Sequence, residues 1–425
     1  MLRIIATSDW HLGNLFHGSD RLEEHLHFLN WLRGQIRNLH PDALLIAGDV
    51  FDNGNPSAAA QSAYYEFLAD VTSDCPEMQI VVTAGNHDSA NRLEAPRALL
   101  SRHRVEVRGV VHRNWIADPE SQKGEWEFDF EDLMIPIEGK DGDKAVILAV
   151  PYLRSDLIQG ENYSTGVRTF LGELTAKARA LYPNRHLVMM THMYASGAII
   201  AEKDASEKVI IGGLEQISLD DWTDHPDYLT SGHIHKRQHI WNTDWARYSG
   251  SVLPMSFAEK DYSHGVDLVS LDATGRPMVE QISYEPQHRL RVIPEDGENL
   301  TPAKLKKLLD KELRNREDGE LSDHYDYVLI KICQDKVKSE DLKDLEDYVG
   351  TKDAVLCKIQ RVVPDLNLST ISQNQKLSSI DEILERDHME ALSEAFLVKH
   401  KQELSDRQRD LLRDMLDNMK NESED

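Results

Sequence analysis

The sequence predicts an α/β protein built as a layered α/β sandwich, because short apolar runs alternate with amphipathic helical patterns along residues 1–285. The apolar runs are continuous and rich in branched aliphatic residues, which is typical of strands buried on both faces. Several short strand patterns near 247–284 indicate added antiparallel strands. These observations together favour a mixed, layered architecture over a purely doubly wound sheet.

The expected elements follow one another in chain order. The helix near 20–37 is indicated by Leu22, Leu26, Leu29 and Ile36, which recur at helical spacing. Further helices are expected near 57–71 and 91–102. Strands are expected at 2–7, 43–47, 80–84, 105–111, 126–130, 145–150, 186–190 and 227–231.

A break in the pattern separates the last third of the chain. Pro286, Pro294, Gly297 and Pro302 interrupt it near 286–300. The predicted domains are therefore 1–285, a small α+β domain at 286–370, and a C-terminal helical pair at 371–425. Within the second domain we expect helices at 302–316 and 339–349 and strands at 325–332 and 354–362. In the third, amphipathic helices are expected over 378–420 and a disordered tail over 421–425.

The composition is that of a soluble globular protein, with 40% hydrophobic and 29% charged residues in 425. No apolar run approaches the length that crosses a bilayer, and the N-terminus shows no secretory pattern. Three scattered cysteines, Cys75, Cys333 and Cys357, argue against a disulfide framework. A cytoplasmic protein without membrane contact is expected.

The acidic balance bears on the choice of substrate. The formal net charge is -26, from 74 acidic and 48 basic residues, whereas proteins that bind nucleic acid alone usually show basic surfaces. Either the substrate is not a polyanion, or the contact is local and a partner supplies most of the positive surface. Divalent ions would make a local site positive, so acidity alone does not exclude a nuclease.

Residues that bind divalent metals recur where apolar runs end. Because α/β folds hold ligands at the carboxyl ends of strands, these side chains are expected to gather along one edge of one sheet. Asp9 and His11, like His233 and His235, are two apart on what we expect to be extended backbone, so each pair should point the same way. The candidate metal ligands are Asp9, His11, Asp49, Asn86, His192, His233 and His235.

The chemistry of these side chains indicates the kind of metal. Imidazoles together with carboxylates suit manganese, iron or zinc, whereas an all-oxygen set would suit magnesium or calcium. Asp49 is the leading candidate for a carboxylate shared by two cations, and Gly48 before it allows a tight turn. Taken singly, each residue could be a capping aspartate or a loop histidine; as a set, they predict a site for two metals.

These motifs resemble those of the calcineurin-like metallophosphoesterase superfamily. The strings Asp9-Trp10-His11-Leu12-Gly13, Gly48-Asp49-Val50-Phe51-Asp52 and Gly85-Asn86-His87-Asp88-Ser89 are more closely similar to the bacterial SbcD exonuclease subunits, counterparts of the break-repair nuclease of archaea and eukaryotes. The segments 151–154 and 160–163 and the pair His233 and His235 add to the likeness. The motifs cover about residues 1–260.

The resemblance implies roles for individual residues. Asp9, His11, Asp49 and His235 would bind one metal, and Asp49, Asn86, His192 and His233 the other, with Mn²⁺ the expected ion. His87 would be catalytic and face the phosphate, as the group that protonates the leaving sugar oxygen. Asp88 would orient the His87 ring.

The resemblance also implies partners. It predicts a 3'-5' exonuclease and endonuclease that acts on DNA ends and hairpins with a coiled-coil ATPase of the SbcC type, in repair, recombination and replication at the nucleoid. Residues 286–370 would be the capping domain. The C-terminal helices would bind the ATPase or pack on their own chain. A homodimer is expected through the helix near 57–71, with Ala58, Ala59, Ala60 and Tyr64, and a heterotetramer with the ATPase.

Two other functions remain open. A phosphodiesterase for a small substrate agrees with the net acidity, although such enzymes often end soon after the last histidine pair. A scaffold that recruits the ATPase without catalysis is disfavoured, because no ligand position is missing. For His17, a loop histidine near the first motif, contact with substrate and simple solvation both remain open. The tryptophans show no spacing typical of a stacking platform, and Arg92 and Arg97 are expected to be solvated.

Overall fold

The structure is a computed structural model that describes residues 1–117, 124–158, 160–199, 216–220, 222–241, 243–272, 274–295, 300–333 and 339–362. The expected helices within 378–420, the tail at 421–425 and the end of the predicted capping domain lie outside the described residues. None of the helices in the described ranges is both long enough and apolar enough to cross a membrane.

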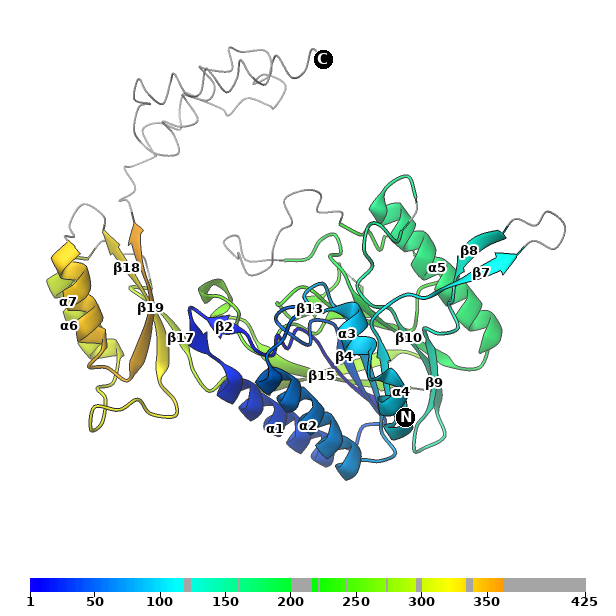
Figure 1. The fold of residues 1–425 in the computed structure, drawn as a ribbon, viewed down its shortest axis with the longest axis horizontal. Coiled ribbons are helices and arrows are strands. Elements are labelled where there is room, and N and C mark those ends of the chain that lie inside the picture. Colours follow the sequence, from blue (N-terminus) through cyan, green and yellow to red (C-terminus); the bar gives the residue numbers. More distant parts are fainter. Residues whose placement is uncertain are drawn as a thin grey trace, which may run out of the picture. The chain divides into compact units, whose positions relative to one another are not determined.

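Two six-stranded mixed sheets form the centre of residues 1–285 (Figure 1). In the first sheet four strands are parallel and β15 and β16 are antiparallel to their neighbours. Its strands, in spatial order, are β16 (Pro277–Tyr284), β15 (His264–Leu271), β1 (Leu2–Thr7), β4 (Ala43–Ala47), β5 (Gln79–Thr83) and β6 (Val105–Arg108).

The second sheet also has a parallel centre, formed by β10, β11, β12 and β14, with β9 and β13 antiparallel at its edges. Its strands, in spatial order, are β13 (Gln238–His239), β14 (Ala246–Tyr248), β12 (Tyr228–Gly232), β11 (His186–His192), β10 (Lys144–Ala149) and β9 (Met134–Glu138). The hairpins β2 (Leu15–Phe16) with β3 (Ser19–Asp20), and β7 (Arg113–Ala117) with β8 (Gly124–Phe128), stand apart from both sheets.

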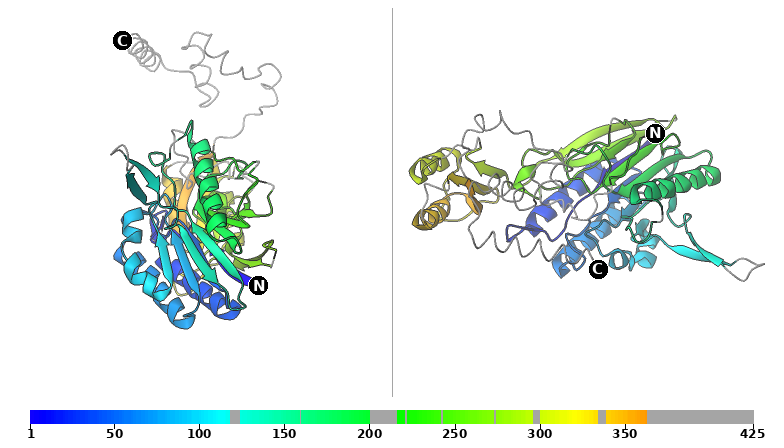
Figure 2. Two further views of the ribbon diagram at one scale, coloured as in Figure 1. Left: turned by 90° about the vertical axis from the view of Figure 1, so that its right-hand side faces the viewer. Right: turned by 90° about the horizontal axis from the view of Figure 1, so that it is seen from above.

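Three apolar clusters define the layers. Helices α1 (Leu22–Leu39) and α2 (Ala58–Asp74) pack on the outer face of the first sheet, and α5 (Tyr163–Leu181) packs on the outer face of the second (Figures 1 and 2). A third cluster, which includes Leu2, Ile4, Leu45, Ile147 and Val188, fills the space between the sheets. The predicted α/β sandwich is therefore confirmed.

Some helices and strands differ from those expected from the sequence. The pattern near 91–102 is divided into α3 (Ala90–Glu94), α4 (Arg97–Leu100) and the 3₁₀ turn η1 (Ser101–His103), because Pro96 interrupts the run. Helix α5 was not predicted, although its N-terminus has a clear signal: the Asn162 side chain accepts a hydrogen bond from the Thr165 N–H. Strands β7, β9 and β17 were also missed.

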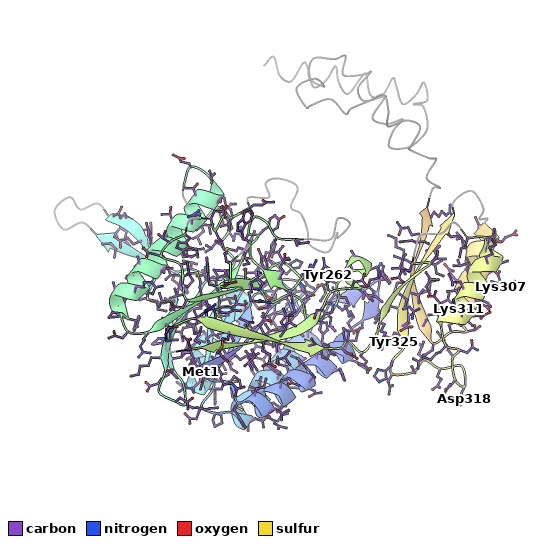
Figure 3. The ribbon with its side chains drawn as sticks, turned by 180° about the vertical axis from the view of Figure 1, so that it is seen from behind. Met1, Tyr262, Lys307, Lys311, Asp318 and Tyr325 are labelled. Atoms are coloured by element: carbon purple, nitrogen blue, oxygen red, sulfur yellow. The ribbon has the colours of Figure 1, made fainter. Side chains whose placement is uncertain are left out.

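Residues 286–362 form a three-stranded parallel sheet covered by two helices. The sheet order is β17 (Leu290–Ile293), β18 (Asp326–Cys333) and β19 (Ala354–Val362), and the helices are α6 (Pro302–Glu312) and α7 (Ser339–Val349). Leu305, Leu309, Ile330 and Leu345 belong to a separate apolar cluster here. Figure 3 shows Lys307 and Lys311 on the helical side of this layer.

Candidate metal centre

The predicted ligands follow five strands, but these strands belong to two sheets. Asp9, Asp49 and Asn86 come after β1, β4 and β5 of the first sheet, whereas His192 ends β11 and His233 follows β12 of the second. The expectation of one edge of one sheet was therefore wrong. The side chains meet where the carboxyl ends of both parallel sets lie together, since apolar residues of the two sheets pack face to face.

The backbone that carries the ligands is not extended. Asp9, His11, Asp49 and His233 have φ values of 52°, 46°, 49° and 90°. The expectation of extended backbone at these positions was therefore wrong, although the donor atoms of Asp9 and His11 still lie within 4.8 Å of each other. Positive φ is costly for residues with a Cβ and concentrates at functional sites, because the surrounding structure must hold it in place.

Three of the predicted ligands form a first cluster. Donor atoms of Asp9, His11 and His235 all lie within 4.8 Å of one another, and all three residues are buried. Neither ring nitrogen of His11 makes a hydrogen bond to any described residue. A buried imidazole normally has a partner, so this ring is suited to a cation that the protein itself does not supply.

A second cluster adjoins the first and shares Asp9 with it. Asp9, Asp49 and His192 again present donor atoms within 4.8 Å of one another. The Oδ1 atom of Asn86 lies 3.0 Å from Nε2 of His192 and 3.0 Å from Nδ1 of His233. All seven predicted ligands are thus brought together in this part of the fold.

Asp49 belongs to the second cluster and also lies near His11 of the first. Its Oδ2 is 3.3 Å from Nε2 of His192 and 3.7 Å from Nε2 of His11, while its Oδ1 accepts the N–H of His87 at 2.8 Å. Burial raises its pKa, but the nearby His192 and His11 outweigh this and hold the pKa well below its usual range. The position and charge of Asp49 agree with the carboxylate expected between two cations.

The histidine pKa values reflect the same crowding. Burial lowers the pKa of His192, but the Asp49 carboxylate raises it overall to about 9. For His233, burial and then the neighbouring His192 lower the pKa to about 3. The Asp49 carboxylate thus favours a charged His192, while burial and His192 keep His233 neutral.

Hydrogen bonds on the far side of the rings direct the other nitrogens inward. His192 Nδ1 lies 3.0 Å from the Ala47 carbonyl oxygen, which leaves Nε2 toward Asp49. His235 Nδ1 lies 3.0 Å from Oε1 of Glu259, and both residues are buried. Metal-binding histidines commonly have such partners, which fix the tautomer and the ring orientation.

Asp52 and Glu259 were not assigned a role from the sequence. Oδ1 of Asp52 lies 3.5 Å from Nδ1 of His11, and Asp52 forms a third cluster with His11 and His87. Its position three residues after Asp49, within the same motif, could have indicated that Asp52 lies at the site. Glu259 could not have been assigned in this way, because it lies far from any motif in the sequence.

The expected relation between Asp88 and His87 was wrong. Nδ1 of His87 lies 2.9 Å from the carbonyl oxygen of Asp52. The Asp88 carboxylate instead accepts hydrogen bonds from the N–H groups of Gly85, Val50 and Phe51. Asp88 therefore braces the two ligand-bearing loops, and burial together with Asp49 raises its pKa to about 6.

Other candidates are accounted for by ordinary contacts. Glu94, His112 and Asp132 form a fourth cluster, but Arg97 pairs with both carboxylates there, so it is an ion-pair network and Arg97 is not merely solvated. The exposed Arg92 donates to Asn55. Trp10 is core, whereas Trp115 and Trp126 form an exposed pair on β7 and β8. In α2, Ala60 and Tyr64 are buried in the chain's own core, and Ala58 and Ala59 are exposed.

The fold and the site together define a metal-dependent phosphoesterase. Residues 2–237 match the family described as calcineurin-like phosphoesterase, and the chain belongs to this family. The site is accordingly one for divalent metal ions, and its residues fit them: buried oxygen and nitrogen donors converge, and the ring nitrogens of His11 make no hydrogen bond to a described residue.

Curated relatives confirm the narrower resemblance. The chain is 35% identical over 287 residues to the D subunit of the SbcCD nuclease of Rhodobacter capsulatus, which covers 65% of this chain and 68% of that one. It is 30% identical to the protein of the same name from Escherichia coli K12, covering 71% and 72% of the two chains. The Bacillus subtilis counterpart is 28% identical, covering 66% and 72%.

Proposed function

We propose that the protein is a DNA nuclease that uses two divalent metal ions and works as the nuclease subunit of an SbcCD-type complex. The observation that carries this proposal is the convergence of seven residues with oxygen or nitrogen donors, Asp49 among them. Relatives named as nuclease subunits support the choice of DNA over a small substrate. The proposed activities are 3'-5' exonuclease and endonuclease cleavage at DNA ends and hairpins.

The proposed ligand sets share Asp49, whereas the two clusters of donor atoms share Asp9. Asp9, His11, Asp49 and His235 would hold one ion, and Asp49, Asn86, His192 and His233 the other. We propose Mn²⁺ for both, since the set mixes imidazoles with oxygen ligands. When bound, such a pair supplies a nucleophile from water near neutral pH and offsets the negative charge of the phosphate.

His87 is proposed as the residue that protonates the leaving sugar oxygen. Its Nδ1–H donates to the Asp52 carbonyl, which accepts, so Nε2 is the nitrogen free to carry the transferred proton. The ring centroid lies 4.9 Å from that of His11, which places it at the edge of the first cluster. A half-buried histidine there can reach both the substrate and solvent.

The proposed partners extend beyond this chain. An SbcC-type coiled-coil ATPase would supply the positive surface that a chain of net charge -26 lacks. We propose that residues 371–425 bind it, that residues 286–370 act as a capping domain, and that two copies of each subunit form a heterotetramer in the cytoplasm at the nucleoid. If α2 forms the homodimer contact, its exposed Ala58 and Ala59 would carry it rather than the buried Ala60 and Tyr64.

The test uses purified protein, manganese and end-labelled linear duplex DNA, with and without the ATPase. Metal-dependent cleavage that Asp49→Asn abolishes is expected. Cleavage of a small phosphodiester with no cleavage of DNA in either condition would favour the small-substrate enzyme. No cleavage of any substrate, together with binding to the ATPase, would favour a scaffold.

Deletion of residues 378–425 separates the partner proposal from the chemistry. The shortened chain is expected to keep its manganese content and lose co-purification with the ATPase. Continued tight association would contradict the proposed role of the C-terminal segment.

A further inference from the structure

The short helix η2 (Phe257–Glu259) brings a buried carboxylate to one of the metal-facing histidines. Oε1 of Glu259 lies 3.0 Å from Nδ1 of His235, and the Glu259 side chain is fully buried. Because Nδ1 is the ring nitrogen that faces Glu259, Nε2 is the nitrogen left for the first cluster, where a donor atom of His235 lies within 4.8 Å of donors from Asp9 and His11.

The carboxylate of Glu259 is itself fixed by its own segment. Oε2 accepts the N–H of Met255 at 2.8 Å, and the N–H of Glu259 donates to the Ser256 carbonyl at 3.1 Å. A buried carboxylate is costly unless its oxygens are bonded, and here each oxygen has a separate partner. The segment 255–259 therefore determines where the carboxylate lies.

The same segment contacts residues 286–362 on its other side. The Phe257 ring lies 5.3 Å from that of Phe16, which in turn lies 5.0 Å from Tyr327 on β18. Next to Glu259, Lys260 Nζ is 2.8 Å from Oε1 of Glu295. Figure 3 shows Tyr325, which packs in the same aromatic cluster, at the edge of the 286–362 layer that faces the sandwich.

A buried ion pair links this contact to the start of the segment. Arg21 donates to the Pro254 carbonyl at 2.6 Å and pairs with Glu24 at 2.8 Å. Glu24 in turn accepts the Tyr327 hydroxyl at 3.2 Å. Both ends of 254–260 are thus held by groups that touch residues 286–362.

We propose that Glu259 is a positioning residue for the metal ligand His235, and that the packing of η2 against residues 286–362 keeps Glu259 in place. The inference rests on the proposed function, since it takes His235 as a ligand. It makes metal binding depend on a contact outside the metal site. Partners of metal-binding histidines often matter in this way, and their loss commonly lowers metal affinity roughly 10- to 100-fold.

The direct test measures manganese affinity of the full chain by isothermal titration calorimetry, and unfolding of the metal-free protein in parallel. The affinity is expected to fall in the order wild type, Glu259→Gln, Glu259→Ala, because glutamine retains an acceptor for the His235 N–H. If the alanine variant does not fold, the glutamine variant is decisive, with weaker binding than the wild type expected. Equal affinity in every folded variant would overturn the inference, even if metal-free stability falls.

The second test addresses the contact with residues 286–362. Lys260→Ala breaks a pair whose side chains are 21% and 78% exposed, and Lys306→Ala breaks a comparable pair with Asp344, 26% and 63% exposed, that does not involve η2. Lower manganese affinity is expected for Lys260→Ala and unchanged affinity for Lys306→Ala. Equal effects would contradict the coupling. A wild type that binds no manganese would instead contradict the proposed function, and this inference with it.

Discussion

The ring of His87 is held by Asp52 and not by its neighbour Asp88: Nδ1 of His87 lies 2.9 Å from the Asp52 carbonyl oxygen. A carbonyl can only accept, so this contact fixes the proton on Nδ1 whatever the charge of nearby carboxylates. It also ties His87 to the loop that carries Asp49, three residues earlier. The chemistry proposed for His87 and the metal binding proposed for Asp49 therefore depend on one loop but on different atoms.

Replacing His87 separates these two roles. His87→Ala is expected to keep the wild-type manganese content and to lose phosphodiester cleavage by about 10²- to 10⁴-fold, because only the proton donor is removed. Metal content is measured by inductively coupled plasma mass spectrometry and cleavage with labelled duplex. The exposed His103 in η1 provides the control, and His103→Ala should leave both unchanged. Depleted metal in His87→Ala would remove the assignment.

The hydrogen bonds of Asp88 predict a role in stability, in place of the expected orientation of the His87 ring. Asp88→Ala would leave the buried N–H groups of Gly85, Val50 and Phe51 without their acceptor, and the free energy of unfolding should fall by about 3 kcal/mol. Urea unfolding of the metal-free protein at pH 8 measures this. Asp272 also accepts backbone N–H groups, from Thr274 and Arg276, but in an exposed turn, so Asp272→Ala should cost much less. Equal losses would contradict the bracing role.

Local patterns predicted most strands and the residues that converge at the site, because both depend on residues close in sequence. The strand predicted at 43–47 has the same bounds as β4, and the polar residues that follow it lie at the site. Helix α5 was also readable, since Val167, Phe170, Leu171 and Leu174 recur at helical spacing. The sequence analysis did not predict α5, although this helical periodicity was present.

Local sequence patterns could not predict how the strands divide between the two sheets. β1 pairs with β15, so that Leu2 lies opposite Leu271, and such pairing is decided by packing between distant segments. Glu259 is similar: its partner His235 is distant in sequence, and a lone glutamate in an acidic chain carries no signal. The positive φ of Asp9 and His11 likewise results from the surrounding fold.

His264 makes stability depend on pH. It is buried on β15, where its Nδ1–H donates to the Ser251 carbonyl, and burial lowers its pKa from 6.5 to about 4. The unfolded chain therefore takes up a proton between pH 6.5 and 4 that the folded protein does not, so the stability present above pH 6.5 is lost as pH falls through this window. At pH 5 the loss is about 2 kcal/mol.

The variant His264→Asn keeps a donor for Ser251 but does not titrate. Its free energy of unfolding should fall less than that of the wild type between pH 7.5 and pH 5, measured by urea unfolding without metal. Parallel pH profiles for the two proteins would show that His264 does not titrate as its burial requires.

Gly48, after β4 of the first sheet, packs closely on His192 at the end of β11 of the second. It has a φ of +82°, and a Cβ there would lie 2.1 Å from Nδ1 of His192. Gly142 has almost the same φ, +85°, but open space around the corresponding position. Alanine at either position should cost about 1–2 kcal/mol for the left-handed backbone. Only Gly48→Ala should also displace His192 and so weaken manganese binding, measured by calorimetry on both variants. If Gly142→Ala weakened manganese binding as much as Gly48→Ala, the loss would come from backbone strain in general, and the close packing of Gly48 on His192 would not be what positions the ligand.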